Sequence, residues 1–351
     1  MLYLLLCNIT LAVLIASLFS TNMVTEFIFE NLSIYLCFDF QFEEIKIDVP
    51  WGHLAGKWYG PKHVRPLLGL HGWQDNAGTF DTLAPLLPSS IPFLSLDLPG
   101  HGRSSWLPEG ISYHSIDYVV LLCRVMDHFN WEKISLLGHS MSSINCFVYS
   151  ALFPDKVDLL ISLDVLKPLT RSASKIVDSY SSRLEAAVKL ERRLREKSEP
   201  PTYEWDQLVE RLHLGSEKSV NKECCKYLLE RNMKPAAHEP DKYYFSRDNR
   251  LKVSLFYAFS QDVPNEMARR IKCPHLFIKA LKAPYYERKE YYDETLAVLK
   301  QNPHFQYHEV DGSHHVHLNE PEKISLTHIF YFEFLPEIFQ LHMWKIPRLV
   351  I

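Results

Sequence analysis

The sequence of 351 residues has no long basic run, no low-complexity tract and no internal repeat. Its 38 Lys and Arg residues nearly balance 42 Asp and Glu residues, which leaves a formal net charge of −4. Because proteins bind nucleic acids chiefly through the phosphates, this balance gives no electrostatic reason to expect a nucleic-acid partner. The 47% share of apolar residues also excludes a mainly disordered chain, since it is enough for a large buried core.

Cysteine is scarce and is not spaced for a disulfide framework or a metal site. The chain has seven cysteines, and an odd number leaves at least one of them unpaired. The adjacent Cys224 and Cys225 have no second Cys-x-x-Cys or His-x-x-x-His pair at the spacing of zinc ligands. The cysteines alone therefore favour a reducing, intracellular setting.

One long apolar run occurs at the amino terminus, over residues 2–19. It carries no charged side chain, and about 18 to 20 such residues can span a bilayer as a helix. We expect residues 1–22 to form a membrane anchor. A cleaved signal, a buried segment and a gene-model artefact stay open as alternatives, although the run lacks the basic start and the clean cleavage site of a signal. A membrane-associated or intracellular location is therefore favoured over secretion.

From about residue 40 onward, short apolar runs alternate with helical stretches. The runs at 66–70, 91–96, 134–137 and 159–163 are apolar on both faces, as strands of a parallel sheet covered by helices must be. Strands that alternate with helices are typical of a doubly wound sheet. The sequence therefore predicts an α/β fold with a mostly parallel sheet.

A helix-rich, charged segment over residues 167–270 interrupts this alternation, which resumes with apolar runs at 275–278 and 305–310. A helical insertion between two strands of one sheet indicates a cap over the carboxyl edge of that sheet. We therefore predict a core made of residues 40–166 and 271–340, with residues 167–270 as a helical cap.

The strongest chemical signal is Gly138-His139-Ser140-Met141-Ser142, which lies between an apolar run and a helical stretch. A nucleophile elbow needs this context, because the glycine passes through a tight turn and the serine is exposed at its apex. The usual pattern is Gly-x-Ser-x-Gly, and Ser142 occupies its last position here. Ser142 is still small enough for close packing of helix on strand. We predict Ser140 as a catalytic nucleophile.

Two further motifs end apolar runs. The sequence His71-Gly72-Trp73 makes a turn, and we expect the backbone N–H groups of Trp73 and Met141 to form an oxyanion hole beside Ser140. The second motif, DLPGHGRSS at residues 97–105, has two glycines around a histidine at a corner of the chain. We interpret this second motif as structural scaffolding, braced by its Arg and Ser side chains.

A histidine-rich segment follows the last apolar run. A serine nucleophile needs an imidazole base, and His314, His315 and His317 compete for that role. A His-His-x-His cluster could also bind a metal, but no Asp, Glu or Cys is spaced in the sequence to complete such a site. We therefore expect no metal here.

Taken in order, the segments HGW, DLPGHGRSS, GHS and GSHHVHLNEPE resemble the α/β-hydrolase superfamily across roughly residues 40–335. The segments HGWQDNAGTFD and YYFSRDNRLK are more specifically similar to the serine hydrolase-like (kraken-type) proteins. The resemblance implies a capped serine hydrolase that cleaves an ester or thioester bond of a small acyl substrate without a cofactor. In this superfamily the base is commonly followed by a proline seven residues on, which selects His314 with Pro321. Vesicular and peroxisomal locations are also compatible with the family.

The resemblance leaves the acidic member of the triad open. Superfamily members commonly carry it just after the seventh strand, where this chain has no carboxylate before Glu287. Other members place it at the end of the sixth strand, a position that Asp164 occupies here. We predict Asp164, with Glu287 and the absence of any acid as alternatives. An incomplete triad would favour a binding or interaction protein, membrane-anchored through residues 2–19.

Overall fold

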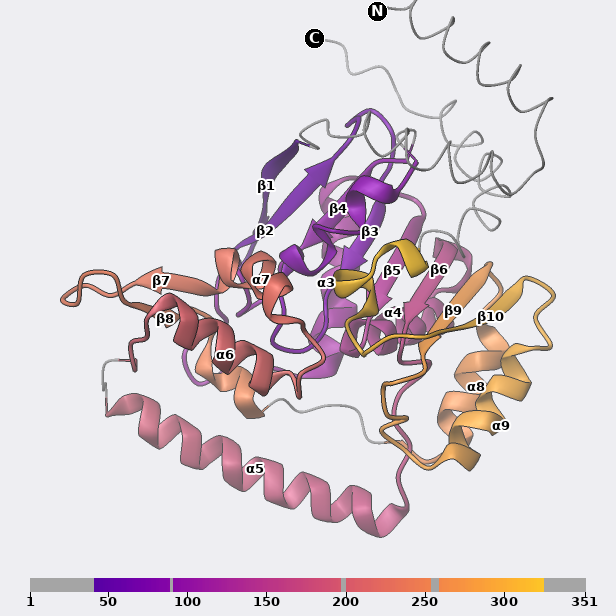
Figure 1. Cartoon of the computed structure of the whole chain (residues 1–351). Helices are drawn as coiled ribbons and strands as arrows, with labels where there is room; N and C mark the ends of the chain where they lie inside the picture. The colour runs from indigo at the N-terminus through magenta and orange to yellow at the C-terminus, as the bar shows by residue number, and fades with distance from the viewer. Residues whose placement is uncertain (1–40, 89–90, 197–199, 254–258, 325–351) are drawn as a thin grey trace, which may run out of the picture. The chain divides into compact units, whose positions relative to one another are not determined.

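The structure, a computed structural model, is shown in Figure 1. The residues that it describes are 41–88, 91–196, 200–253 and 259–324. The predicted amino-terminal segment, 1–22, and the end of the predicted core, 325–340, lie outside the described residues. No helix within the described ranges is long and apolar enough to cross a membrane.

Within the described ranges, eight strands form one sheet. They are β1 (Phe42–Val49), β2 (Gly52–Tyr59), β3 (Leu67–Leu70), β4 (Phe93–Leu96), β5 (Ile134–His139), β6 (Val157–Leu163), β9 (His275–Ala280) and β10 (Phe305–Val310). Their order in the sheet is β1-β2-β4-β3-β5-β6-β9-β10. Strand β2 is antiparallel to β1 and β4, and the other neighbours are parallel. The predicted α/β fold with a doubly wound, mostly parallel sheet is therefore confirmed.

Helices and short turns of 3-10 helix connect these strands. The helices are α3 (Ser115–His128), α4 (Met141–Leu152), α5 (Ala173–Arg195), α6 (Trp205–Gly215), α7 (Cys225–Asn232), α8 (Asp262–Arg270), α9 (Lys289–Leu299) and α10 (Val316–Asn319). The 3-10 turns η1 (Ala77–Phe80) and η2 (Ala84–Leu86) lie between β3 and β4. A two-stranded hairpin, β7 (Met233–Pro235) with β8 (Tyr243–Phe245), follows α7.

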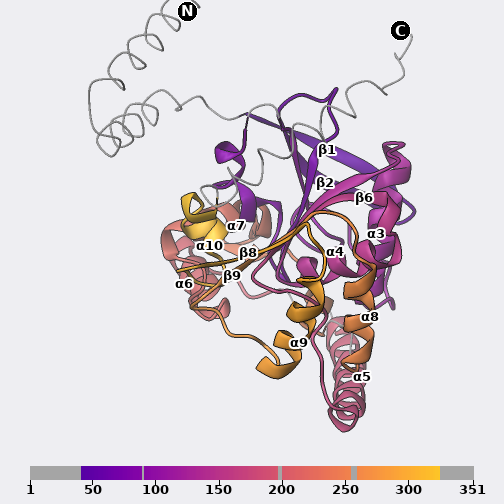
Figure 2. The same ribbon diagram turned by 90° about the vertical axis from the view of Figure 1, so that its right-hand side faces the viewer.

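Apolar side chains pack on both faces of the sheet. Helices α3, α4, α8 and α9 contribute to the larger core, and η1, η2 and α10 contribute to the second one. Figure 2 shows α3, α4 and α8 on the same side of the sheet. Every residue of β3, β4 and β5 is buried, as expected for parallel strands covered by helices on both faces.

The predicted cap segment, 167–270, begins shortly after β6 and contains α5, α6, α7, the β7–β8 hairpin and α8. In Figure 1, α6, α7 and the hairpin lie together, and the long helix α5 runs below them. Helices α6 and α7 share a third apolar cluster that includes Leu208, Leu228 and Leu229. Helix α8, in contrast, packs against α4 and α9, which belong to the predicted core. The boundary of the cap at residue 270 stays a prediction.

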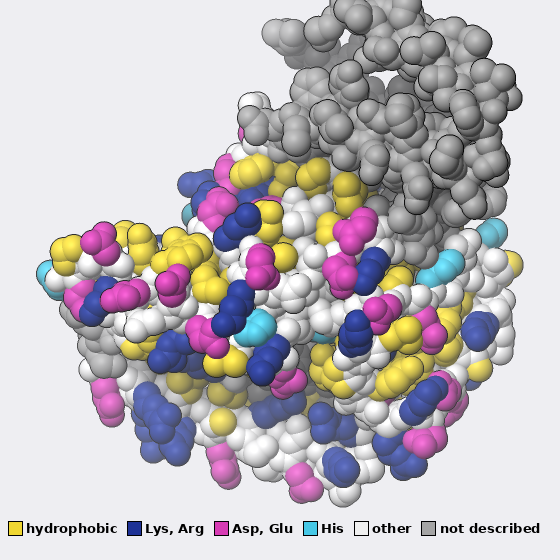
Figure 3. Space-filling model, viewed as in Figure 1, with side chains coloured by type: hydrophobic (Ala, Val, Ile, Leu, Met, Phe, Trp, Pro, Cys, Tyr) yellow, Lys and Arg dark blue, Asp and Glu magenta, His cyan; other side chains and the backbone are white. Residues whose placement is uncertain are grey.

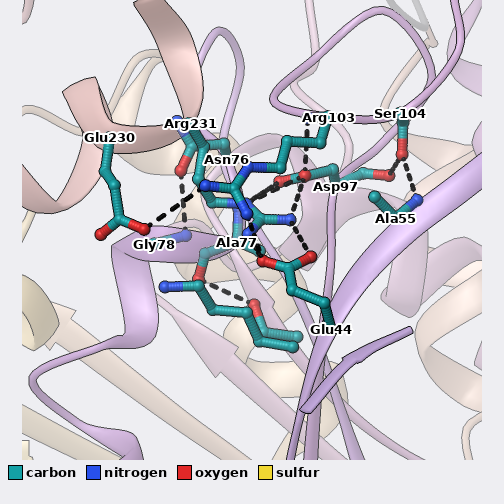
Figure 4. Close-up of polar contacts among 12 residues, drawn as sticks. Glu44, Ala55, Asn76, Ala77, Gly78, Asp97, Arg103, Ser104, Glu230 and Arg231 are labelled. Carbon is teal, nitrogen blue, oxygen red and sulfur yellow. Dashed lines mark hydrogen bonds and ion pairs between the residues drawn. The ribbon is translucent and has the colours of Figure 1, made fainter. Parts of the chain in front are cut away.

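A buried ion pair ties α7 to the sheet (Figure 4). The Nη2 atom of Arg231 on α7 lies 2.7 Å from Oδ2 of Asp97, directly after β4, and neither side chain is exposed. Asp97 also accepts hydrogen bonds from the backbone N–H groups of Ala77 at 2.7 Å and Arg103 at 2.8 Å. The hydroxyl of Ser104 donates to the Asp97 carbonyl at 2.6 Å. These contacts agree with the interpretation of the DLPGHGRSS motif as scaffolding, and they extend it to α7.

Candidate active site

Ser140 lies in the tight turn between β5 and α4, with a φ of 55° and a ψ of −116°. L-amino acids rarely adopt positive φ, and such strain is typical of functional turns. A Cβ atom at Gly138 would lie 2.6 Å from the Ser142 backbone, so the turn requires glycine there. The Ser142 hydroxyl donates a hydrogen bond to the carbonyl of His71 at 2.5 Å. The serine that replaces the usual glycine thus joins α4 to the end of β3.

The structure brings three predicted catalytic residues together. The Oγ atom of Ser140 lies 2.9 Å from Nε2 of His314, which lies in the loop before α10. The Nδ1 atom of His314 is hydrogen-bonded to Oδ2 of Asp164. Asp164 directly follows β6 and, with a φ of 67°, turns sharply from the strand. A continuous chain of hydrogen bonds therefore runs from the serine hydroxyl to a buried carboxylate.

The second oxygen of Asp164 is also fully engaged. Its Oδ1 accepts hydrogen bonds from Nζ of Lys279 at 2.6 Å and from the backbone N–H of Ala280 at 3.0 Å. Burial by itself raises the pKa of Asp164, but the contacts with His314 and Lys279 outweigh it and lower this pKa below its ordinary value. An ionised Asp164 favours the tautomer in which His314 carries its proton on Nδ1. The Nε2 lone pair of His314 is then free to accept the proton of Ser140.

Glu287, the alternative acid, has other partners. Its Oε2 atom lies 2.7 Å from Nζ of Lys167 and accepts a hydrogen bond from the backbone N–H of Thr170 at 2.9 Å. Burial raises the pKa of Glu287, and the Lys167 ammonium only partly offsets this. The geometry therefore favours Asp164 as the carboxylate that orients His314.

The residues predicted to form the oxyanion hole border the same cavity as Ser140. Met141 is the first residue of α4, and the N–H groups of a first helical turn have no acceptor within the helix. Trp73 follows β3, and its indole Nε1 donates a hydrogen bond to the carbonyl of Leu251 at 2.8 Å. The role of the Trp73 and Met141 backbone N–H groups in binding an oxyanion stays a prediction.

A second group of histidines surrounds a carboxylate that the sequence argument missed. The Oδ2 atom of Asp75 lies 3.1 Å from Nε2 of His315 and 3.5 Å from Nδ1 of His139. The donor atoms of these three residues lie within 4.8 Å of one another, so they could hold a metal ion. We expected no carboxylate to complete a metal site with the histidines. This expectation was wrong, because the fold brings Asp75 to His315, which lies 240 positions later in the chain. The absence of a metal stays a prediction.

Of the three histidines that competed for the role of base, His315 and His317 form hydrogen bonds with residues other than Ser140. Nδ1 of His315 lies 2.8 Å from the Ser219 hydroxyl, and Nε2 of His317 lies 2.9 Å from the Thr79 hydroxyl. Burial would raise the pKa of Asp75, but His315 and His139 together hold it well below its usual value. The selection of His314 as the candidate base therefore agrees with the geometry.

A cavity of about 840 Å³ opens in front of Ser140 and His314. The core contributes Trp73, Met141 and His315 to its wall. The predicted cap contributes residues of α6 and of the segment after β8. Sites of this size accept a small organic molecule. The cavity therefore offers space for a substrate between the nucleophile and the predicted cap.

Comparisons with known proteins define the class. Residues 65–201 match the family model described as "alpha/beta hydrolase fold". The crystal structure of the hypothetical protein PA1622 from Pseudomonas aeruginosa is 30% identical, with a TM-score of 0.70, and the match covers 84% of this chain and 99% of that chain. A thioesterase domain from the curacin biosynthetic pathway shares 20% identity and a TM-score of 0.67, over 82% of this chain and 99% of that domain, which shows the fold alone. The fold is that of the α/β hydrolases.

Curated relatives narrow the class to a family. A "probable serine hydrolase" of Drosophila melanogaster is 37% identical over 83% of this chain and 87% of its own length. "Serine hydrolase-like protein 2" of Homo sapiens is 32% identical over 80% of this chain and 91% of its own length. The chain therefore belongs to the serine hydrolase-like family of α/β hydrolases, as its sequence motifs indicated.

Proposed function

We propose that the protein is a serine hydrolase that cleaves a carboxylic ester or a thioester through an acyl-enzyme formed on Ser140. The observation that carries this proposal is the hydrogen-bonded chain from Ser140 through His314 to Asp164, with 2.9 Å between Oγ and Nε2. A serine hydroxyl is a weak nucleophile until an adjacent base removes its proton, and the base works best when a third group orients it.

In the first half of the reaction, Oγ of Ser140 attacks the carbonyl carbon while Nε2 of His314 takes the hydroxyl proton. Asp164 stabilises the imidazolium that results. The backbone N–H groups of Trp73 and Met141 donate hydrogen bonds to the carbonyl oxygen as it becomes negative. The tetrahedral intermediate then loses the alcohol or thiol, which takes the proton from His314 as the C–O or C–S bond breaks.

In the second half, water hydrolyses the acyl-enzyme. His314 takes a proton from the water as the water oxygen attacks the acyl carbon, and the same oxyanion contacts stabilise the second tetrahedral intermediate. The bond from the acyl carbon to Oγ of Ser140 then breaks, and Oγ recovers the proton from His314. The products are a carboxylic acid and the free enzyme.

A binding protein with an incomplete triad is the alternative that the sequence left open. That alternative gains if the carboxylate of Asp164 is remote from His314. The hydrogen bond between Asp164 and Nδ1 of His314 supports the enzyme instead.

Mass spectrometry of the intact protein tests the acyl-enzyme directly. We expect a burst of p-nitrophenol from p-nitrophenyl butyrate, together with a fraction of protein that carries one butyryl group on Ser140. The Ser140→Ala variant should show neither. The Ser150→Ala variant is a matched control on α4, because the Ser150 hydroxyl donates a hydrogen bond within the helix, to the Cys146 carbonyl at 2.8 Å. A folded wild-type protein that gives no burst and no adduct with butyryl esters or thioesters would overturn the proposal.

A further inference from the structure

Cationic side chains crowd the cavity that contains Ser140. Seven of its lining residues are Lys or Arg, and two are Asp or Glu, although the whole chain has a net charge of −4. The positive charge is therefore concentrated at this site. Figure 3 shows Lys and Arg side chains, interspersed with Asp and Glu, on the face that carries α5 and α6. The basic lining residues are Arg171, Arg183, Arg211, Lys218, Arg247, Lys252 and Lys282.

The lining itself holds few acids to balance this charge, although Lys282 pairs with Asp311 outside it at 2.9 Å. Of its two acids, Asp75 already faces His315 and His139. Arg247 and Lys252 line the same cavity, where burial and then the charge of Arg247 lower the pKa of Lys252. Like charges that line one cavity repel one another, and an anion bound between them reduces this repulsion. The cavity wall therefore favours a negatively charged ligand.

Of these cations, Arg247 is the one best placed to bind an anion. Its guanidinium lies 5.2 Å from the ring centre of Phe245, and within the described part of the chain no carboxylate or carbonyl pairs with it. Burial lowers the pKa of Arg247, and the charge of Asp75 only partly offsets this. A guanidinium that borders a cavity and pairs with no acceptor among the described residues is suited to a ligand that supplies one.

The neighbouring Arg250, in contrast, is paired with other groups of the fold. Both arginines belong to the YYFSRDNRLK segment. The guanidinium of Arg250 donates to Asp248 at 2.6 Å and to the carbonyls of Pro108 at 2.6 Å and Ile111 at 2.9 Å. Arg250 thus links this segment to the loop that contains Pro108 and Ile111, whereas Arg247 borders the cavity that contains Ser140.

We infer that the substrate carries a carboxylate or a phosphate in addition to its ester or thioester group, and that Arg247 binds this anionic group. This inference rests on the proposed function, because it names the substrate class of the same site. A guanidinium forms two parallel hydrogen bonds with either anion, which a Lys ammonium cannot reproduce.

Matched pairs of esters test the inference. Mono-p-nitrophenyl adipate carries its carboxylate on the acyl side, and 3-(4-butanoyloxyphenyl)propanoate carries it on the alcohol side. Each is compared with its primary amide, which has nearly the same shape and no charge. We expect at least one anionic ester to exceed its amide in kcat/KM by about tenfold or more, as a charge-assisted contact allows. Turnover of the amides without a preference for either anion would overturn the inference.

Substitutions assign the preference to Arg247. Arg247→Met should abolish the preference for the anionic ester and change kcat/KM of its amide by less than about threefold. Arg247→Lys should retain part of the preference. Arg270→Met removes an exposed cation that pairs with Glu266 outside the cavity, and it should behave as the wild type. An Arg247→Met enzyme that keeps the preference, or loses both activities equally, would contradict the assignment.

A binding measurement separates this inference from the proposed function. Adipate and phenyl phosphate are titrated calorimetrically into the Ser140→Ala protein. This measurement does not depend on catalysis. We expect saturable binding of at least one of these anions, weakened about tenfold or more when Arg247→Met is added. If the wild type hydrolyses no ester but this binding holds, the proposed function fails and the anion site stands. If neither anion binds, the anion site fails whether or not the protein is an enzyme.

Discussion

Lys279 holds Asp164 from the side opposite to His314, with 2.6 Å between Nζ of Lys279 and Oδ1 of Asp164. Both side chains are only 2% exposed, so water screens this ion pair weakly. Lys279 also donates to the carbonyls of Ala280 at 2.9 Å and Ala283 at 3.0 Å. The lysine therefore fixes the carboxylate that orients the candidate base.

Replacing Lys279 tests the strength of this support. We expect Lys279→Met to lower the free energy of unfolding by about 3 kcal/mol, because a buried Asp164 then loses its cationic partner. Urea denaturation measures the loss. Lys282→Met is the matched control. The side chains of Lys282 and Asp311 are each 63% exposed, so their ion pair should contribute less than about 1 kcal/mol to the free energy of unfolding. Equal losses in the two variants would contradict this account of Lys279.

Asp164→Asn separates the two candidate acids. An amide at residue 164 stabilises the wrong tautomer of His314, so we expect the rate of labelling of Ser140 by a fluorophosphonate to fall about 10²- to 10⁴-fold. Glu287→Gln should leave the rate within about threefold of the wild type, because Glu287 pairs with Lys167. A large effect of Glu287→Gln with an unchanged rate in Asp164→Asn would reverse the assignment.

The dependence of stability on pH should carry the signature of Asp164. The folded protein holds the pKa of Asp164 below its ordinary value of 3.8, so the unfolded chain binds this proton more readily. The stabilisation is therefore fully present above about pH 4 and is lost as the pH falls through the folded-state pKa. We expect the difference in unfolding free energy between the wild type and Asp164→Asn to be constant from pH 7 to 5 and to shrink below pH 4. A difference that grows on acidification would mean that the folded state raises this pKa.

The ion pair between α7 and the sheet should be a major determinant of stability. Arg231→Met leaves Asp97 buried without its cation, and we expect a loss of about 3 to 5 kcal/mol in the free energy of unfolding. Arg103→Met provides a control, because Arg231 and Arg103 both form an ion pair with Glu44, but the Arg103 side chain is 45% exposed. That control should cost less than about 1 kcal/mol. Thermal or urea unfolding that shows Arg231→Met to be as mild as the control would contradict the role of this pair.

The strands and the elbow could be predicted because their signals are local. The apolar run at 134–137 forms the first four residues of β5, and the Gly-x-Ser turn follows it directly. Parallel strands buried on both faces leave a continuous apolar pattern, and a tight turn leaves its glycine and serine within a few positions. The order of the strands and the contacts across them leave no such local pattern.

The partners of the site residues could not be predicted because they depend on how the strands pair. Asp164 and Lys279 meet only because β6 and β9 are neighbours in the sheet. The sequence does contain a hint, because Lys279 is a charged residue in the otherwise apolar end of β9. Nothing in its local sequence, however, connects it to Asp164. In the same way, Arg247 and Arg250 are alike in the sequence, and only the contacts of their guanidinium groups distinguish them.

Labelling with a fluorophosphonate probe tests the central claim most directly, since the probe reacts with a serine only when its hydroxyl is activated. We predict that the folded wild-type protein is labelled on Ser140, that Ser140→Ala is not labelled, and that Ser150→Ala is labelled at the wild-type rate. Peptide mapping of the labelled protein identifies the modified residue. A folded wild-type protein that does not react, or a label that persists in Ser140→Ala, would contradict the assignment of Ser140 as the nucleophile.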